Sequence, residues 1–312
     1  MRDACNYCPR SNNGKGCKIP FCGDVTTFSD AQTQSSGIRL AAACLHFGEE
    51  PPITGDKGSG TVFLSGCNLH CVFCQNYQIS QNGMGRVVSI NEFADICLQL
   101  QNLGGENINI VTGSHAIPEI KAGIELARNP NYQHSPLTIP CLWNSGAYET
   151  VAAVELIDTF ADAYLPDLKT LDSEISYNFF NAANYPSVAS DAILAMIKTT
   201  KPVIIRHLVL PGFLEATKKV LEWIAHNLKD NVKISLMTQY TPIKNSISMA
   251  KNVPDRYLSD MEYEQLLEWI EFYDIDGFYQ ELELGNEWLP DFENAKPFPT
   301  DLCKMVWHWG NN

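Results

Sequence analysis

Three cysteines lie close together in the stretch Ser65-Gly-Cys-Asn-Leu-His-Cys-Val-Phe-Cys-Gln-Asn76. Cys67, Cys71 and Cys74 have the spacing C-x3-C-x2-C and directly follow an apolar run. Cysteine thiolates hold iron-sulfur clusters, and a cluster of four irons normally takes four cysteines. A tight group of three therefore leaves one iron without a protein ligand, and an open iron can bind a molecule that reacts.

Zinc is the competing interpretation of these three cysteines. Structural zinc is four-coordinate and its ligands come in pairs such as C-x2-C. No obvious fourth ligand follows within residues 65–76. The spacing therefore favours an iron-sulfur cluster over zinc.

The composition narrows the class of protein. A chain of 312 residues fits either two average domains or one α/β barrel, and its 45% hydrophobic residues can bury a full core. The formal net charge is -14, from 22 basic and 36 acidic residues. Because nucleic-acid affinity depends largely on Lys and Arg that neutralise phosphates, we expect no nucleic-acid partner.

The distribution of apolar and cysteine residues indicates the compartment. No apolar run approaches the roughly 20 residues that cross a bilayer, and no charged-then-apolar leader opens the chain. The chain contains 11 cysteines, an odd number, and they are clustered. This suits metal binding in a reducing compartment better than a disulfide framework, so we expect a cytoplasmic protein without a membrane partner.

A second group of cysteines opens the chain. Cys5, Cys8, Cys17 and Cys22 have the spacing C-x2-C-x8-C-x4-C within a short polar segment that cannot form a core of its own. Four thiolates can fold such a segment around a tetrahedral zinc or a rubredoxin-like iron, or they can hold a second cluster. Free thiols in a loose N-terminus are the remaining alternative. The sequence does not choose between zinc and iron as this second metal.

The segments after residue 60 alternate between strand and helix patterns. This alternation is expected of βα units around a parallel sheet, and it predicts an α/β fold with a curved or partly open barrel. Residues 38–47 fit either a short helix or a strand. Expected strands are 61–65, 107–111, 137–143, 163–168, 203–210, 232–237 and 277–280, and expected helices are 89–101, 118–128, 149–159, 190–198, 215–228 and 260–272.

Three regions follow from this pattern. Residues 1–50 form a cysteine-rich N-terminal extension, residues 51–282 form the barrel, and residues 283–312 form a tail rich in aromatic side chains. Such aromatic residues more often cover an open sheet edge than bind a cofactor, so we expect the tail to pack on the barrel.

The cysteine spacing, with Phe73 as the aromatic residue before the third cysteine, resembles the signature of the radical S-adenosylmethionine (SAM) superfamily. The resemblance implies a partial (βα)6 barrel and a 4Fe-4S cluster on Cys67, Cys71 and Cys74, with Phe73 and Asn76 beside the cofactor. It also implies that SAM binds the open iron and is cleaved reductively. The resulting 5'-deoxyadenosyl radical would abstract hydrogen from a substrate.

Polar residues at the ends of the expected strands are the candidates for binding the cofactor. Active sites of parallel α/β barrels collect at the carboxyl ends of the strands. Members of the superfamily carry Gly-Gly-Glu after the second strand, but here residues 104–106, which have that sequence, precede the strand. By resemblance, Thr112 and Ser114 therefore take the place that contacts the methionine end of SAM, and His115 is a candidate acid or base. A hydrogen-bonding structural role is the alternative for His115.

Later strands add four candidates. Asn144 can bind the carboxylate or ribose of SAM or can cap a turn. Asp167 and Lys169, in Asp167-Leu-Lys169, resemble the activating enzymes of glycyl radical enzymes and are candidate catalytic residues. Arg206 interrupts an apolar strand and therefore needs a partner, which is either the ligand, as the resemblance implies, or a structural ion pair.

Three further stretches of sequence resemble one particular group within this superfamily. Glu49-Glu-Pro-Pro-Ile53, Gly58-Ser-Gly-Thr61 and Cys5-x2-Cys8-Pro-Arg10 are similar to the PflX-type homologues of pyruvate formate-lyase activating enzyme. The implied activity is abstraction from a glycine of a glycyl radical enzyme, with flavodoxin or ferredoxin as electron donor. Two alternatives stay open: a radical enzyme that modifies a small molecule or a peptide side chain, and a non-catalytic iron-sulfur or zinc protein.

Overall fold

The chain folds as a partial α/β barrel, as the alternating sequence pattern predicted. The computed structural model describes residues 7–10, 28–30, 33–35, 37–133, 135–228, 230–243, 252–282, 284–286, 288–299 and 301–311. Parallel pairing joins β4 (Ser59–Leu64), β6 (Ile108–Val111), β7 (Cys141–Ser145) and β8 (Ala163–Pro166) in one sheet, and β9 (Ile204–Leu208), β10 (Lys233–Met237) and β11 (Gly277–Tyr279) in another. Parallel bridges from Tyr164 to Val203 and from Asp167 to Arg206 connect the two sheets into one curved wall.

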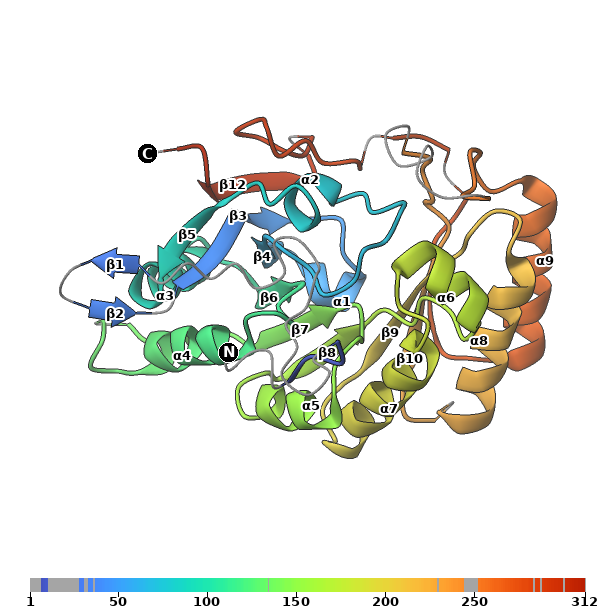
Figure 1. Ribbon diagram of the computed structural model, residues 1–312, viewed down its shortest axis with the longest axis horizontal. Helices are drawn as coiled ribbons and strands as arrows, with labels where there is room; N and C mark the ends of the chain where they lie inside the picture. The colour runs from blue at the N-terminus through green and yellow to red at the C-terminus, as the bar shows by residue number, and fades with distance from the viewer. Residues whose placement is uncertain are drawn as a thin grey trace.

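Helices between successive strands cover the outside of this wall (Figure 1). They are α3 (Ile90–Asn102), α4 (Ile117–Arg128), α5 (Val151–Asp158), α6 (Ser173–Phe180), α7 (Tyr185–Lys198), α8 (Leu214–Asn227) and α9 (Asp260–Tyr273). Two one-turn helices, α1 (Pro51–Thr54) and α2 (Tyr77–Ser80), lie before β4 and after the three cysteines. Each long crossover returns the chain to the same end of the wall, so the carboxyl ends of the strands lie together.

Antiparallel strands extend the sheet beyond β4. Strand β3 (Gly37–His46) pairs with β4, with β5 (Arg86–Ser89) and with β12 (Cys303–His308), while β1 (Phe28–Asp30) and β2 (Thr33–Ser35) form a separate hairpin. Residues 38–47, for which the sequence allowed helix or strand, are therefore almost entirely strand. Part of the C-terminal tail is a strand, β12, which pairs with β3, and the packing of the tail as a separate region on the barrel stays a prediction.

The strands present different side chains to their two faces. Trp143, Tyr164 and Ile205 alternate along the chain with Leu142, Leu165 and Ile204, as the two-residue period of a strand requires. The first set packs in the large core with the helices, and the second set forms a small apolar cluster with Ile53 of α1. This second cluster fills the inside of the barrel next to α1.

Several boundaries differ from the sequence-based expectation. The strand expected at 137–143 begins at Cys141, after Pro140, because proline has no amide hydrogen to donate to the ladder. The helix expected from 190 begins at Tyr185, and α6 was not expected at all. Ser89 caps α3 by accepting from the amide of Glu92, as predicted.

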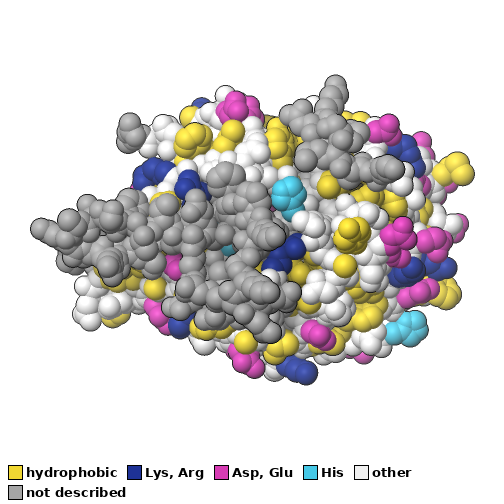
Figure 2. Space-filling model, in the orientation of Figure 1, with side chains coloured by type: hydrophobic (Ala, Val, Ile, Leu, Met, Phe, Trp, Pro, Cys, Tyr) yellow, Lys and Arg dark blue, Asp and Glu magenta, His cyan; other side chains and the backbone are white. Residues whose placement is uncertain are grey.

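The surface carries both signs of charge. On the face shown in Figure 2, Asp and Glu side chains are mixed with Lys and Arg side chains toward the right, where α8 and α9 lie. Within the described ranges, no helix is both long and apolar enough to cross a membrane. The division at residues 50 and 282 stays a prediction.

Candidate functional site

The cysteine loop, residues 65–76, leaves the carboxyl end of β4. Gly66 has a φ of 96°, a conformation that glycine adopts without the steric cost of a side chain, so the chain can turn there. Cys67, Cys71 and Cys74 follow this turn and precede α2. The three thiols therefore lie at the edge of the barrel where parallel α/β barrels place their active sites.

Contacts with the end of α6 hold the cysteine loop. The amide of Val72 donates to the carbonyl of Phe179 at 2.9 Å, and the amide of His70 donates to the carbonyl of Phe180 at 3.3 Å. The ring of Phe73 packs edge-on against both phenylalanines, with centroid distances of 6.0 and 5.8 Å. Phe73 is thus an anchor of the loop, and its role beside the cofactor stays a prediction.

Burial controls the protonation of the three thiols. It raises the pKa of Cys67 to about 12 and raises the pKa values of Cys71 and Cys74 above the ordinary range, although the charge of Lys169 acts in the opposite direction on all three. The thiols are therefore neutral at pH 7 unless a metal displaces their protons, as happens when thiolates ligate a metal. The backbone amide of Asn76 also acts on Cys74 and lowers its pKa.

The donor set fits an iron-sulfur cluster better than a single ion. In the part of the chain that the structure describes, no three His, Cys, Asp or Glu side chains are grouped closely enough to hold one metal ion. Cysteines that bind a four-iron cluster each take a different iron, so they stand farther apart than the ligands of one ion. The loop presents three soft thiol donors of the kind that iron-sulfur clusters select.

The turn after β6, residues 112–115, is strained. Thr112 has a φ of 61°, which a β-branched residue rarely adopts, and its amide donates to the carbonyl of Asn144 at 2.9 Å. A Cβ atom at Gly113 would lie 2.6 Å from the ring of Trp143, so only glycine fits there. Strain of this kind concentrates at functional sites, and this turn lies where the sequence predicted the methionine end of SAM.

A buried carboxyl group, Glu149, joins this turn to the segment after β7. Its Oε1 accepts hydrogen bonds from the hydroxyl of Ser114 and from the indole nitrogen of Trp143, both at 2.7 Å. Glu149 is 1% exposed, and burial raises its pKa. The Ser114 hydroxyl, predicted to contact SAM, is therefore already committed to Glu149.

His115 connects the same turn to the cysteine loop. Its Nε2 donates to the carbonyl oxygen of Ser65 at 2.8 Å, and the side chain is buried. This contact is the structural role that the sequence left open for His115. Its role as a catalytic acid or base stays a prediction.

Asp167 and Lys169 lie together after β8. Lys169 Nζ and Asp167 Oδ2 are 2.6 Å apart, and the two side chains are 22% and 28% exposed. Burial opposes the charge of Lys169, but Asp167 and the nearby Cys71 and Tyr185 outweigh it and raise the pKa of Lys169. The Tyr185 hydroxyl also bonds the backbone of both residues, accepting from the amide of Lys169 and donating to the carbonyl of Asp167.

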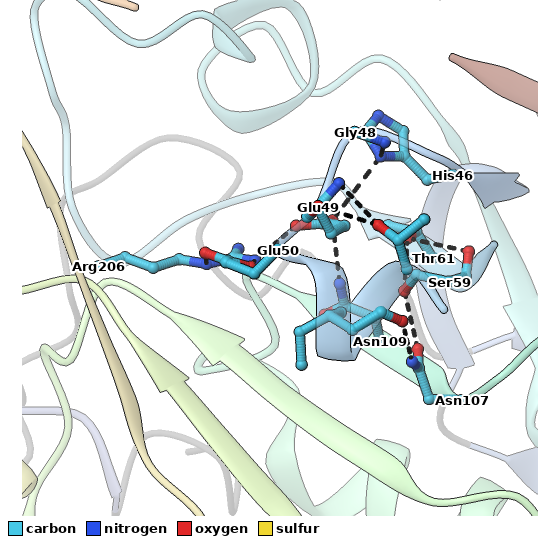
Figure 3. A network of polar contacts seen from close by, with 11 residues as sticks. His46, Gly48, Glu49, Glu50, Ser59, Thr61, Asn107, Asn109 and Arg206 are labelled. Atoms are coloured by element: carbon cyan, nitrogen blue, oxygen red, sulfur yellow. Dashed lines mark hydrogen bonds and ion pairs between the residues drawn. The ribbon is translucent and has the colours of Figure 1, made fainter. Parts of the chain in front are cut away.

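Arg206 is enclosed by two carboxylates inside the barrel (Figure 3). Its Nε donates to Glu50 Oε1 at 2.8 Å, and its Nη2 donates to Glu49 Oε2 at 2.5 Å and also contacts Glu50. Asn109 donates to the remaining oxygen of Glu49 at 3.1 Å. Burial alone would raise the pKa of Glu50, but Arg206 holds it below its ordinary value. The guanidinium thus has its partners within the protein, and its contact with SAM stays a prediction.

The neighbouring His207 points to the other face of β9. It is buried between the carbonyl of Leu168, 2.7 Å from Nδ1, and the hydroxyl of Thr217, 2.9 Å from Nε2. Burial lowers its pKa to about 4, so it is neutral at pH 7. Asn144, in contrast, lies on the inner face of β7 and is 9% exposed.

The structure adds residues that the sequence did not single out. Glu149 was placed at the start of a helix, and Tyr185 lay in a segment without a predicted element. Of the N-terminal cysteines, Cys8 is buried, while Cys5, Cys17 and Cys22 lie outside the described residues. Within the described segment 7–10, Arg10 reaches the cysteine loop by donating from Nε to the carbonyl of Asn68 at 2.5 Å.

Comparison with known proteins identifies the class. The sequence profile of the Radical SAM superfamily matches residues 61–224. An uncharacterized protein of Methanocaldococcus jannaschii, MJ0674, is 34% identical over 248 residues, which cover 75% of this chain and 68% of that protein. The chain belongs to the radical SAM superfamily, and it is a radical SAM enzyme, a class that cleaves SAM reductively.

Solved structures share the fold at low sequence identity. Streptococcus suis SuiB is similar with a TM-score of 0.51 and 14% identity, over 72% of this chain and 48% of SuiB. A radical SAM methyltransferase from Sphaerobacter thermophilus is similar with a TM-score of 0.50 and 13% identity, over 71% of this chain and 66% of that one. The chain thus spans about half the length of SuiB, and these likenesses confirm the partial radical SAM barrel alone.

Proposed function

We propose that Cys67, Cys71 and Cys74 ligate a 4Fe-4S cluster and that SAM binds beside it at the carboxyl ends of the barrel strands. The observation that carries the proposal is the cysteine loop itself, which leaves β4 at that end and is fixed to α6 and to His115. When bound, the cluster supplies one electron that splits SAM into methionine and a 5'-deoxyadenosyl radical. The protein residues bind SAM, orient it and exclude water.

Each strand end has a distinct task in this proposal. The strained turn at Thr112 and the inward amide of Asn144 bind the polar groups of SAM, while Glu149 holds that turn through Ser114. The pair of Asp167 and Lys169 lies next to Cys71 and offers a carboxylate and an ammonium to SAM or substrate. Such paired polar groups with a shifted pKa are typical of functional sites.

The proposed hydrogen donor is a backbone glycine of a glycyl radical enzyme. The support is the resemblance of Asp167-Leu-Lys169 to the activating enzymes and the acidic composition, which suits a protein or small-molecule partner better than nucleic acid. The electron comes from a flavodoxin or ferredoxin in this proposal. A small molecule or a peptide side chain as donor is the competing outcome.

Product analysis after anaerobic reconstitution tests this function. The reduced wild-type protein should convert SAM to 5'-deoxyadenosine, and Cys71→Ala should abolish the conversion. Cys97→Ala is the control, because Cys97 is also a free cysteine but lies in α3 and not in the cysteine loop. A wild-type protein that assembles no cluster and forms no 5'-deoxyadenosine would support the non-catalytic alternative instead.

Isotope transfer then identifies the donor. Deuterium from a glycine-labelled partner enzyme should appear in 5'-deoxyadenosine if the donor is a protein glycine. Transfer from a labelled small molecule or peptide side chain, without transfer from the glycine, would favour the competing outcome.

The N-terminal cysteines belong to the proposal as a second metal site. Cys5, Cys8, Cys17 and Cys22 would bind zinc or iron through four thiolates, in the cysteine-rich extension that precedes the barrel. Elemental analysis of a variant with Cys67, Cys71 and Cys74 all changed to Ala measures this metal without the cluster. About one zinc or one iron per chain is expected, and a metal-free protein would contradict the second site.

A further inference from the structure

The described N-terminal segment, residues 7–10, lies against the proposed active site. The hydroxyl of Thr150, the residue that caps α5, donates to the carbonyl of Tyr7 at 3.2 Å. Cys8 is buried, so the segment is packed against the rest of the protein. In Figure 1 this segment, drawn in dark blue, lies in front of the barrel strands near α5.

Arg10 connects three parts of the chain. Its Nε donates to the carbonyl of Asn68, in the cysteine loop between Cys67 and Cys71, at 2.5 Å. Its Nη2 donates to the carbonyl of Phe180 at 3.4 Å, and its guanidinium carbon lies 5.2 Å from the ring centroid of Tyr148. Arg10 therefore spans the cysteine loop, the end of α6 and the segment after β7.

Two residues that Arg10 contacts also take part in hydrogen bonds that hold the cysteine loop. The carbonyl of Phe180 accepts from Arg10 and also from the amide of His70. Asn68 in turn donates from Nδ2 to the carbonyl of Tyr148 at 2.6 Å. Because a guanidinium has several donors in a fixed plane, one side chain can fix the relative positions of these segments, which a lysine cannot do.

Arg10 also brings a positive charge to the cysteine loop. Its guanidinium donates to the carbonyl of Asn68, the residue that follows Cys67, and the ammonium of Lys169 is the other cation that acts on this loop. Lys169 is paired with Asp167, whereas the hydrogen bonds of Arg10 to described residues go to carbonyl oxygens. Net charge and hydrogen bonds near a cluster set its reduction potential, and a cation favours the reduced, more negative form.

We infer that Arg10 is a positioning residue that clamps the cysteine loop and favours reduction of the cluster, so that the described segment 7–10 modulates the radical site. The inference rests on the proposed function for its redox part only.

Amide hydrogen exchange on the cluster-free protein tests the clamp. Arg10→Met should raise the exchange rate of peptides that cover residues 67–74 by about tenfold, since the bonds of His70 and Val72 to α6 would open more often. Arg86→Met is the matched control, because Arg86 also lies over an aromatic ring, Trp307, at 4.9 Å, but in β5. Equal exchange in Arg10→Met and wild type would overturn the clamp.

A redox titration, monitored by electron paramagnetic resonance, tests whether the charge of Arg10 favours reduction of the cluster. At a fixed potential, the ratio of reduced to oxidised cluster should be about tenfold lower in Arg10→Met than in wild type, whereas Arg10→Lys should stay within about threefold of wild type. An unchanged ratio in Arg10→Met would overturn the redox part. A wild-type protein without a cluster would count against the proposed function, and the exchange experiment would still decide the clamp. Circular dichroism of each variant shows whether it folds.

Discussion

Removing the positive charge of Arg206 should destabilise the protein strongly at neutral pH. In Arg206→Met, Glu49 and Glu50 remain buried, with side chains 12% and 7% exposed, but lose the cation between them. Breaking a buried ion pair from one side costs about 3–5 kcal/mol, because the remaining charge is left uncompensated. With about 2.1 cal/mol/K of unfolding entropy per residue over 312 residues, the melting temperature should fall by roughly 5–8 °C.

The stability lost in Arg206→Met should be smaller at acid pH. This pH dependence distinguishes an electrostatic cause from a loss of packing. In wild type, Arg206 holds the pKa of Glu50 in the folded protein below its ordinary value. The ion pair therefore stabilises the fold at pH values above the pKa that Glu50 has in the unfolded chain. This stabilisation is lost as the pH falls through the lower pKa that Glu50 has in the folded protein. In Arg206→Met only burial remains, and it raises the pKa of Glu50. The variant therefore loses stability as pH rises from the unfolded pKa to that raised value, and the gap from wild type should narrow as pH falls toward about 4.5.

Urea denaturation of the cluster-free protein at neutral pH and near pH 5 measures both effects. The variant Glu49→Gln/Glu50→Gln/Arg206→Met should recover most of the lost stability, because no buried charge is left unpaired. Arg256→Met is the control: its partner pair with Glu262 is at the surface and should contribute at most about 1 kcal/mol. A loss below 1 kcal/mol in Arg206→Met, or one that does not depend on pH, would refute the buried network.

Three further substitutions probe the strand ends. Gly113→Ala should cost about 1–3 kcal/mol in urea denaturation and weaken SAM binding, because its Cβ would meet the ring of Trp143 at 2.6 Å. Glu149→Gln should gain stability relative to wild type as pH rises, since burial raises the pKa of Glu149 and its ionisation destabilises the folded state. Thermal melts of both proteins between pH 4.5 and 8 measure this difference. Melting temperatures that change with pH in the same way in both proteins would contradict it. Lys169→Met should lower 5'-deoxyadenosine formation by about tenfold or more, and an unchanged rate would exclude a functional role for the ammonium.

Local sequence patterns were sufficient to predict the elements that position the candidate site residues, whose roles stay predictions. The spacing of Cys67, Cys71 and Cys74 is a local pattern, so the loop and its three thiol donors could be recognised without knowledge of any distant residue. The alternation of apolar segments placed Thr112 and Asn144 after strands, and parallel strands share one carboxyl edge, so their proximity followed. The same reasoning placed residues 104–106 at the opposite edge, and the structure has them in the turn before β6.

The partners of buried polar side chains were not predictable in this way. Arg206 bonds Glu50 across 156 positions, and Ser114 bonds Glu149 across 35. A local pattern shows that a polar residue in an apolar strand needs a partner, but not which of 36 acidic residues the fold brings to it. The tertiary arrangement decides this, and here it gives Arg206 partners within the protein.

The missed helix α6 shows a second limit. Its eight residues, Ser173–Phe180, are half polar and half hydrophobic, and helices this short depend on tertiary packing rather than on intrinsic propensity. Two of its side chains, Phe179 and Phe180, pack against Phe73 of the cysteine loop. A helix that was not predicted from the sequence therefore holds the loop that the sequence marks most clearly.

The buried charges inside the barrel and those near the cysteine loop have different partners. The interior next to α1 holds one guanidinium and two carboxylates, so it cannot offset the negative charge of three thiolates and a reduced cluster. The cations that act on the thiols are Lys169, which Asp167 partly compensates, and Arg10 at Cys67. If a cluster held by three thiolates is to accept a further electron in a chain of net charge -14, both cations would favour its reduction. Arg10 differs from Lys169 in that its hydrogen bonds to described residues go to carbonyl oxygens and not to a carboxylate. This gives the described segment 7–10 a physical reason to lie against the cysteine loop.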